Sequence, residues 1–318
     1  YEIASCLVGS EMCIRDRLGT VLTSALTISL LAGCGTSTSS KKKVGIIQFM
    51  DHTSLNEIKD SFDKEMKTLG YDDKNIEYTF KNGQGDTNTC ASIANDFAGK
   101  NFDCVMAIAT PAAQAVAKLA NKTPVVFSAV TDPVGAQLTS SLTKPDKNIT
   151  GTSDEVQVDQ IIDKALEINS NTRTIGMLYN KGEANSVTNI KKAKAYCAKK
   201  NVKVEEATIA SVNEAQSAVN VLNSKCDAIF APNDNTVASA MNVVSDACKK
   251  ANKPLYVGAD SMVKDGGFLS VGIDYKELGK ETAKIVDKVL KGNKVENIPV
   301  KVFKTNLKIY VNTTTKDT

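Results

Sequence analysis

The chain has 318 residues, of which 42% are apolar and 24% charged, and its formal net charge is only +3. This length exceeds one comfortable hydrophobic core, so we expect two lobes. The weak, evenly spread charge argues against a nucleic-acid binder, and a single histidine, His52, leaves little for histidine-based catalysis or a zinc site.

The N-terminal segment is predicted to lie outside the fold. Residues 6–17 resemble translated sequencing-adapter sequence, and residues 18–31 are an uncharged, mostly apolar run of signal-peptide length. The run ends in Leu-Ala-Gly-Cys, which is similar to the lipobox of bacterial lipoproteins and implies a lipid on Cys34. We interpret residues 1–33 as an adapter-like artefact plus signal peptide and residues 34–42 as a lipidated tether. The alternative is a secretory signal with a chance cysteine.

Strand-like and helix-like segments alternate in the first half of the remaining chain. Apolar runs predict four strands, at residues 44–49, 76–80, 104–109 and 125–130. Cap and stop signals predict helices between them, at residues 54–69, 86–99 and 110–119. Ser54 and Glu57 have capping-box spacing, Asp86 is a cap, and Thr110 before a proline starts a helix, a device that Asp132 repeats.

The second half repeats this alternation. Further strands are predicted at residues 175–179, 202–207, 228–231, 255–258 and 268–273, with a strand-like tail at 300–311. Helices are predicted around residues 154–165, 186–197, 213–222, 236–250 and 275–290. A regular alternation of strand and helix indicates an α/β protein with a parallel sheet in each half.

Five cysteines fall within the predicted fold and show no metal-site or redox spacing. They are Cys90, Cys104, Cys197, Cys226 and Cys248. An odd number without a Cys-x-x-Cys pattern favours small buried apolar residues over a disulfide framework.

Polar residues follow the predicted strands, where ligands bind in open parallel sheets. These residues are Gln48, Thr110, Thr131, Asp132, Ser153, Asp154, Tyr179, Asn180, Asn233, Asp234, Asn235, Asp274 and Tyr275. Helix capping is the competing explanation for most of them, because Asp, Asn, Ser and Thr are preferred N-caps. Capping explains Gln48, Tyr179, Tyr275 and the nearby Glu183 less well.

The charge of these turns indicates the class of ligand. Five carboxylates lie at candidate cleft positions, namely Asp132, Asp154, Glu183, Asp234 and Asp274, against one lysine, Lys181. Carboxylates favour a cationic group such as an ammonium, and helix N-termini can hold an anionic group. Together they suit a zwitterion, with Tyr179, Tyr275 and Phe49 available to sandwich its side chain. His52 is either a ligand contact or an ordinary loop residue.

No motif for catalysis is present. The sequence lacks G-x-S-x-G, a P-loop, and G-x-G-x-x-G after the first strand. We therefore expect a binding protein without a cofactor or a metal, rather than an enzyme.

Seven short motifs in order resemble the tryptophan/tyrosine-type ABC transporter substrate-binding proteins, a branch of the type I periplasmic-binding-protein fold. The motifs are NGQGD (82–86), AIATPAAQ (107–114), VVFSAVTDP (125–133), TGTSD (150–154), YNKGEANS (179–186), PNDNTVASA (232–240) and GIDYKELG (272–279). The resemblance implies two doubly wound parallel-sheet lobes joined by three crossovers. Lobe 1 would comprise residues 43–149 and 275–302, and lobe 2 residues 150–274 and 303–318.

The resemblance also implies an aromatic or related amino acid as ligand. Contacts carried over from the motifs fall on Ala109, Thr110, Thr131, Asp132, Ser153, Asp154, Tyr179, Glu183, Asn185, Ser186, Asp234, Asn235 and Asp274. The expected function is a monomeric, lipid-anchored solute-binding protein on the outer face of the bacterial cytoplasmic membrane. It would close about its hinges on a small zwitterion and deliver it to an ABC permease and its ATPase. The alternative is a receptor of the same fold that senses a nucleoside or sugar and signals to a membrane sensor.

Overall fold

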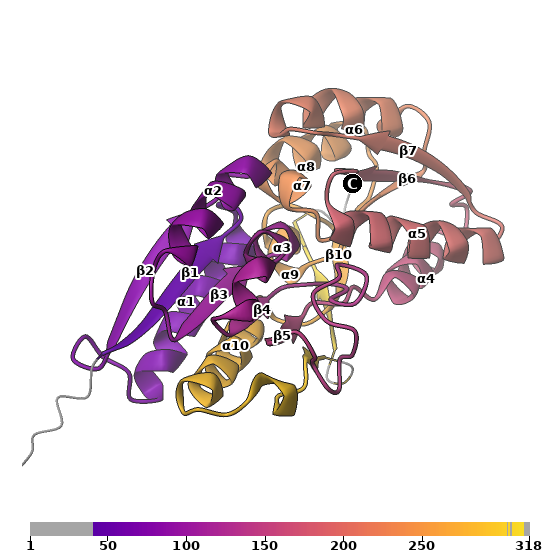
Figure 1. Cartoon of the computed structure of the whole chain (residues 1–318). Helices are drawn as coiled ribbons and strands as arrows, with labels where there is room; N and C mark the ends of the chain where they lie inside the picture. Colours follow the sequence, from indigo (N-terminus) through magenta and orange to yellow (C-terminus); the bar gives the residue numbers. More distant parts are fainter. Residues whose placement is uncertain (1–40, 304, 306, 315–318) are drawn as a thin grey trace, which may run out of the picture. The chain divides into compact units, whose positions relative to one another are not determined.

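The computed structural model describes residues 41–303, 305 and 307–314 (Figure 1). The predicted signal peptide and the predicted lipidation site, Cys34, lie outside this part of the chain. Within it, no helix combines the length and the apolar character needed to cross a membrane.

The first lobe is built on a six-stranded parallel sheet, sheet A, with the strand order β11-β5-β4-β3-β1-β2. Its strands are β1 (Lys42–Gln48), β2 (Ile76–Asn82), β3 (Cys104–Ile108), β4 (Val125–Ser128), β5 (Ile149–Ser153) and β11 (Lys301–Val302). The inner strands β3 and β4 are buried throughout, as expected for a sheet covered on both faces, whereas the edge strand β2 is mostly exposed. The four strands predicted in the first half are confirmed, with small shifts at their ends.

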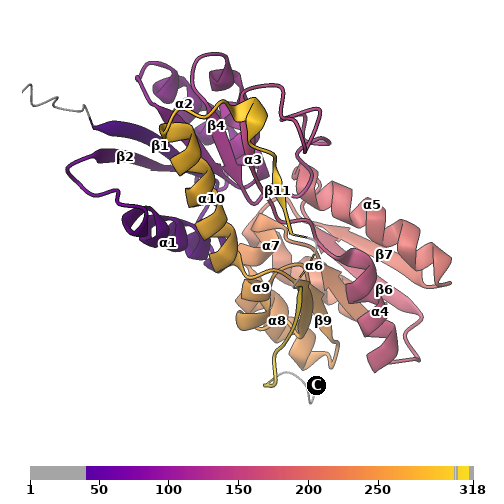
Figure 2. The same cartoon turned by 90° about the horizontal axis from the view of Figure 1, so that it is seen from below.

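Helices cover both faces of sheet A. They are α1 (Thr53–Thr68), α2 (Thr87–Ala98), α3 (Thr110–Val116) and α10 (Tyr275–Leu290), with short 3-10 turns η1 (Ala117–Asn121) and η3 (Val295–Asn297). Helices α1 and α10 pack together on one face, and α2 and α3 lie on the other (Figure 2). Gly279 permits the close approach of α10 to α1, because a Cβ at this position would collide with the backbone oxygen of Ile58.

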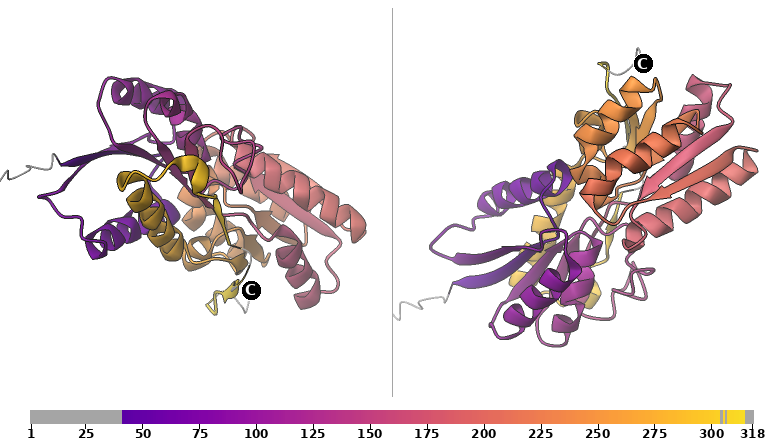
Figure 3. Two further views of the ribbon diagram at one scale, coloured as in Figure 1. Left: turned by 60° about the horizontal axis from the view of Figure 1, so that its bottom comes forward. Right: turned by 90° about the horizontal axis from the view of Figure 1, so that it is seen from above.

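The second lobe is built on sheet B, with the strand order β12-β10-β9-β8-β6-β7. Its strands are β6 (Thr174–Tyr179), β7 (Lys203–Thr208), β8 (Ala228–Ala231), β9 (Leu255–Val257), β10 (Leu269–Gly272) and β12 (Lys308–Val311). Its helices are α4 (Val158–Ile168), α5 (Ala184–Lys199), α6 (Ala215–Asn223), α7 (Asn235–Ser239), α8 (Met241–Lys250) and α9 (Asp260–Lys264), with the 3-10 turn η2 (Val212–Glu214). Helices α4 and α5 cover one face and α6 and α8 the other (Figure 3). The edge strand β12 alone runs antiparallel to its neighbour.

The chain passes between the sheets three times, so the predicted fold of two doubly wound lobes and three crossovers is confirmed. The first passage follows Ser153, because β5 pairs with β4, so sheet A extends beyond the boundary predicted after residue 149. The second lies between Gly272 and Tyr275, and the third between β11 and β12. Asp154, at the end of β5, therefore belongs to the rim of sheet A.

Several local predictions are wrong. Ser54 and Glu57 form no capping box, because Ser54 bonds to Ser261 and Glu57 pairs with Lys264. The turn that begins at Asp132 does not continue into a helix. The helix predicted over residues 236–250 is divided into α7 and α8, and the C-terminal tail forms two short strands in different sheets.

Two predictions based on local chemistry are confirmed. The Asp86 side chain caps α2 by accepting a hydrogen bond of 2.6 Å from the Thr89 backbone N–H. The five cysteines of the described fold are all buried and free, as expected for small apolar residues.

Candidate functional site

The carboxyl ends of the strands of both sheets carry the polar residues that meet between the lobes. Thr131 and Asp154 follow β4 and β5 of sheet A, and Tyr275 begins α10. From sheet B, residues 183–186 follow β6 and residues 233–236 follow β8. This arrangement places the predicted turns where open parallel sheets bind ligands.

Asp154 is the centre of the sheet A side and is only 6% exposed. Its carboxylate accepts hydrogen bonds from Thr131 Oγ1 (3.0 Å), Tyr275 Oη (2.7 Å) and Asn233 Nδ2 (2.6 Å), the last reaching across from the second lobe. Burial raises the pKa of Asp154, and the hydrogen bonds from Tyr275, Asn233 and Thr131 oppose that rise. Among the described residues, no lysine or arginine pairs with this carboxylate. Asp154 is therefore a buried carboxyl group held by neutral donors.

Glu183 and Asp234 form a second acidic group, around the N-terminus of α7. Glu183 Oε1 accepts from the Thr236 backbone N–H (3.1 Å) and hydroxyl (3.0 Å), and Oε2 accepts from the backbone and side-chain amides of Asn235. Asp234 caps α7 at Val237 (2.8 Å) and also accepts from Ser186 Oγ (2.6 Å). Both carboxylates thus satisfy N–H groups that the start of a helix leaves free.

The surroundings of this pair disfavour a second negative charge. Burial, and then the charge of Asp234, raise the pKa of Glu183 to about 8, although hydrogen bonds from Asn235 and Thr236 act in the opposite direction. Burial also raises the pKa of Asp234. Together with Asp154, these groups make the rim acidic and poor in compensating cations.

A small cavity lies where the two rims meet. Its lining is His52, Ser54, Leu55, Ala129, Asp154, Asn185, Asn233, Asp234, Asn235, Ala238, Met262 and Tyr275. Only about 10 Å³ is open to the centre of a water molecule, which is room for about one water. Side chains from the two lobes fill the interior, so a ligand as large as an amino acid requires the lobes to separate first.

Further hydrogen bonds join the lobes around this cavity. His52 Nε2 lies 3.1 Å from Asn235 Oδ1, and Ser239 Oγ donates to the Asp51 carbonyl (3.2 Å). Burial lowers the pKa of His52 to about 4, so its ring is neutral at physiological pH. Around this cavity, these two lobe contacts are therefore made by neutral polar groups.

Several predicted site residues line this cavity or its immediate shell. His52, Asp154, Asn185, Asp234, Asn235 and Tyr275 line it directly. Thr131, Ser153, Glu183 and Ser186 lie one hydrogen bond away, in contact with those residues or with one another. Thr110 Oγ1 is buried without a partner within the described residues, and Ala109 before it has a φ of 80°, an uncommon value for a residue with a side chain.

Two of the predicted site residues, Tyr179 and Asp274, do not line this cavity. Tyr179 donates instead to Glu206 on the neighbouring edge strand β7 (2.9 Å), so it cannot sandwich a ligand with Tyr275 in this structure. Asp274 caps α10 at Lys276 (2.8 Å). The sequence can place a tyrosine at the end of a strand, and so at the rim of the sheet, but it does not show in which direction the ring points.

Three further predicted residues also have local roles. Asp132 accepts from Gly135 N in a turn (2.8 Å), and Gln48 Nε2 donates to the Met50 carbonyl (2.9 Å). Asn180 bonds to Thr236 Oγ1 (2.9 Å), behind the cavity lining. These residues shape the turns rather than the cavity wall.

Asn233 is among the polar residues that follow the predicted strands, but it is not among the predicted ligand contacts. Its amide nitrogen bonds to Asp154 and to Thr131 Oγ1 (2.8 Å), and its oxygen accepts from Asn189 Nδ2 (2.7 Å). The sequence feature that could have identified Asn233 as a site residue is its position after β8, directly before Asp234. Its partner across the lobes could not be identified from that position.

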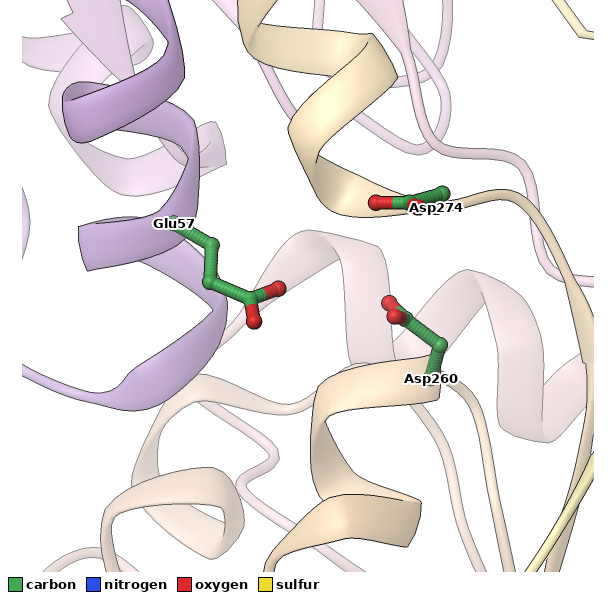
Figure 4. A group of neighbouring side chains, drawn as sticks. All are labelled: Glu57, Asp260 and Asp274. Carbon is green, nitrogen blue, oxygen red and sulfur yellow. The ribbon is translucent and has the colours of Figure 1, made fainter.

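A separate group of acids lies beside the site, where Glu57, Asp260 and Asp274 approach one another (Figure 4). Lys264 Nζ lies 2.9 Å from Glu57 Oε1 and 2.8 Å from Asp260 Oδ2. Glu57 belongs to α1 and Lys264 to α9, so this ion pair also joins the lobes. Lys264 therefore balances the charge of these acids, whereas no lysine or arginine among the described residues pairs with Asp154.

Comparison with known proteins identifies the family. A family model described as ABC transporter substrate binding protein matches residues 43–317. The chain belongs to the ABC transporter substrate-binding protein family. It is 33% identical over 297 residues to a protein of Clostridioides difficile named tyrosine-binding protein, covering 89% of this chain and 86% of the relative.

Two solved structures of similar proteins have the same fold. One is an ABC domain from Streptococcus pneumonia in complex with L-Trp, with 38% identity, a TM-score of 0.84 and coverage of 87% and 94% of the two chains. The other is a conserved domain protein from Vibrio cholerae, with 37% identity, a TM-score of 0.84 and the same coverage. ABC substrate-binding proteins act outside the cytoplasm and bind ligands without transforming them, which agrees with the prediction that this chain is not an enzyme.

Proposed function

We propose that this ABC substrate-binding protein captures an aromatic amino acid as a zwitterion between its lobes. Asp154 carries the proposal: a buried carboxylate held by three neutral donors is the natural partner for the ammonium group of a ligand. Lobe closure removes water around this pair and strengthens its attraction. Similarity to a tyrosine-binding protein and to an L-Trp complex supports an aromatic side chain.

The cavity lining supports the same ligand class. Leu55, Ala129, Ala238 and Met262 provide apolar surface for a ring, while Asp154 provides the charge. The ligand carboxylate would be met by N–H groups at the start of α5, where Asn185 and Ser186 lie in the first turn. Opening and closing would occur at the three passages between the lobes.

A binding panel tests this proposal directly. The melting temperature of the purified protein would be measured with each of the twenty amino acids, a nucleoside and a sugar, since a ligand that binds only the native state must raise it. We expect an aromatic amino acid to give the largest rise, and its N-acetyl derivative to give none, because acetylation removes the ammonium charge. Equal binding of the acetylated ligand would contradict the role of Asp154.

Membrane anchoring and delivery to a permease complete the proposal. The lipobox-like sequence supports a lipid on Cys34, which would keep the protein beside an ABC permease on the outer face of the cytoplasmic membrane. Replacing Cys34 with serine should release the exported protein from membranes into the soluble fraction. Retention of the variant in the membrane fraction would contradict anchoring at this residue.

A further inference from the structure

Three side chains form a continuous hydrogen-bonded chain from the second lobe into the cavity. Glu183 Oε2 accepts from the side-chain amide of Asn235, and Asn235 Oδ1 lies 3.1 Å from His52 Nε2. The pKa of Glu183 is raised to about 8, and the proton that it holds at neutral pH can lie on Oε1, beside the Thr236 hydroxyl, which can accept it. Oε2 also accepts from the Asn235 backbone N–H, so it stays an acceptor, and the side-chain amide nitrogen of Asn235 must point towards it. The oxygen of Asn235 consequently points towards His52.

This order of donors and acceptors also fixes the tautomer of His52. The Asn235 oxygen can only accept, so Nε2 of the imidazole must carry a proton. Burial keeps the ring neutral, with a pKa lowered to about 4, so there is no second proton for Nδ1. Nδ1 is therefore a hydrogen-bond acceptor.

That acceptor is buried and has no partner among the described residues. His52 lines the cavity between the lobes together with the apolar side chains of Leu55 and Met262. Buried acceptors in native proteins normally have a donor. Within the described part of the chain, Asn185 Oδ1 is a second unpartnered acceptor of the lining, but it lies in the first turn of α5. The His52 acceptor, beside Leu55 and Met262, suits a ring that carries a single O–H or N–H group.

We propose that His52 determines ligand specificity by accepting a hydrogen bond at Nδ1 from the side chain of the ligand, and that Glu183 and Asn235 are positioning residues that hold it in the required tautomer. This inference rests on the proposed function and narrows it. The donor is the phenol of tyrosine or the indole N–H of tryptophan, and phenylalanine is disfavoured because it leaves the acceptor unpaired.

The single histidine of the sequence makes a direct test possible. In protein labelled with ¹⁵N-histidine and freed of any tag, the spectrum should show a neutral ring protonated at Nε2 from pH 6 to pH 8. Adding L-tyrosine or L-tryptophan should shift the Nδ1 resonance towards that of a hydrogen-bonded acceptor, whereas L-phenylalanine should not. A ring protonated at Nδ1, or equal shifts with all three ligands, would overturn the proposal.

Affinity measurements provide the second test. Calorimetry should show that the wild type binds L-tyrosine at least about 100-fold more tightly than L-phenylalanine. His52→Phe also removes the lobe contact with Asn235, which should weaken the binding of both ligands, but it should reduce the ratio itself at least about tenfold. His52→Asn, which returns an acceptor near Nδ1, should restore part of the ratio. Equal losses for both ligands would refute the proposed specificity.

These results separate the two proposals. If phenylalanine and tyrosine bind equally well to the wild type, the amino-acid-binding function stands and the role of His52 is wrong. If neither they nor tryptophan bind, the proposed function fails, and the specificity inference fails with it.

Discussion

Replacing Asp154 with asparagine would remove the negative charge of the site while preserving its shape. In the structure, Asn233 and Tyr275 both donate to Asp154 Oδ2, and Thr131 donates to Oδ1. An introduced amide can keep its oxygen towards Asn233 and Tyr275 and donate its N–H to the Thr131 hydroxyl, which can also accept. We therefore expect the folded structure to be retained, with a change in the free energy of unfolding within about 1 kcal/mol.

Ligand affinity should respond far more strongly than stability. Losing one partner of a buried, hydrogen-bonded charge pair costs about 2 to 5 kcal/mol, which corresponds to about 30-fold to 4000-fold in the dissociation constant. Calorimetry with L-tyrosine at pH 7 measures this loss. A ligand without the ammonium group, 3-(4-hydroxyphenyl)propionate, should bind the variant at least as well as it binds the wild type.

Asp132→Asn is the matched control for this experiment. Asp132 also follows a strand of sheet A, but it accepts from Gly135 in a turn and does not line the cavity. This variant should bind L-tyrosine as the wild type does. Unchanged affinity in Asp154→Asn, or an equal loss in Asp132→Asn, would refute the assignment of the ammonium group to Asp154.

Three further predictions concern stability and lobe closure. The pKa of Glu183 rises to about 8 on folding, so between pH 6.5 and pH 8 it holds its proton only in the folded state. The pKa of His52 is lowered to about 4, which gives a smaller opposing gain, so the free energy of unfolding should fall by about 1 kcal/mol over this range. Chemical denaturation should show this slope, and Glu183→Gln should flatten it. Lys264→Met removes the half-exposed ion pair with Glu57 that joins the lobes, so L-tyrosine affinity should fall less than about fivefold, with a weaker dependence on salt in calorimetry. It also leaves the buried Asp260 without its lysine, so the free energy of unfolding should fall as well. Asp86→Ala removes a helix cap and should cost about 1 kcal/mol in denaturant unfolding, with no effect on ligand affinity.

The architecture could be predicted because burial on both faces gives parallel strands a continuous apolar sequence. The runs that became β3 and β4 are buried throughout, and polar turns mark their ends. The cap at Asp86 could be predicted for a similar reason, since its partner, Thr89, is three residues away. Local chemistry was sufficient in both cases.

The sequence located the site at the strand ends, but it did not assign a role to each of the residues there. Asn233 meets Asp154 from 79 residues away, and Ser54 meets Ser261 from 207 residues away, so no local pattern records either contact. Tyr179 was misassigned because alternation along a strand does not show which neighbour its hydroxyl will find. Here that neighbour is Glu206 on an edge strand.

The five buried cysteines have a practical consequence for observing motion in this protein. Burial raises the pKa of every one of these thiols, and it raises those of Cys90, Cys197 and Cys226 to about 11. Because the thiolate is the reactive form, thiol-reactive dyes will not label these cysteines at neutral pH. In a chain whose cysteines before residue 41 have been replaced, one new thiol at exposed Val134 and another at exposed Val243 would carry a fluorophore pair without background labelling. Energy transfer between the two dyes would then measure, in single molecules, how often the lobes close and how long each ligand keeps them closed.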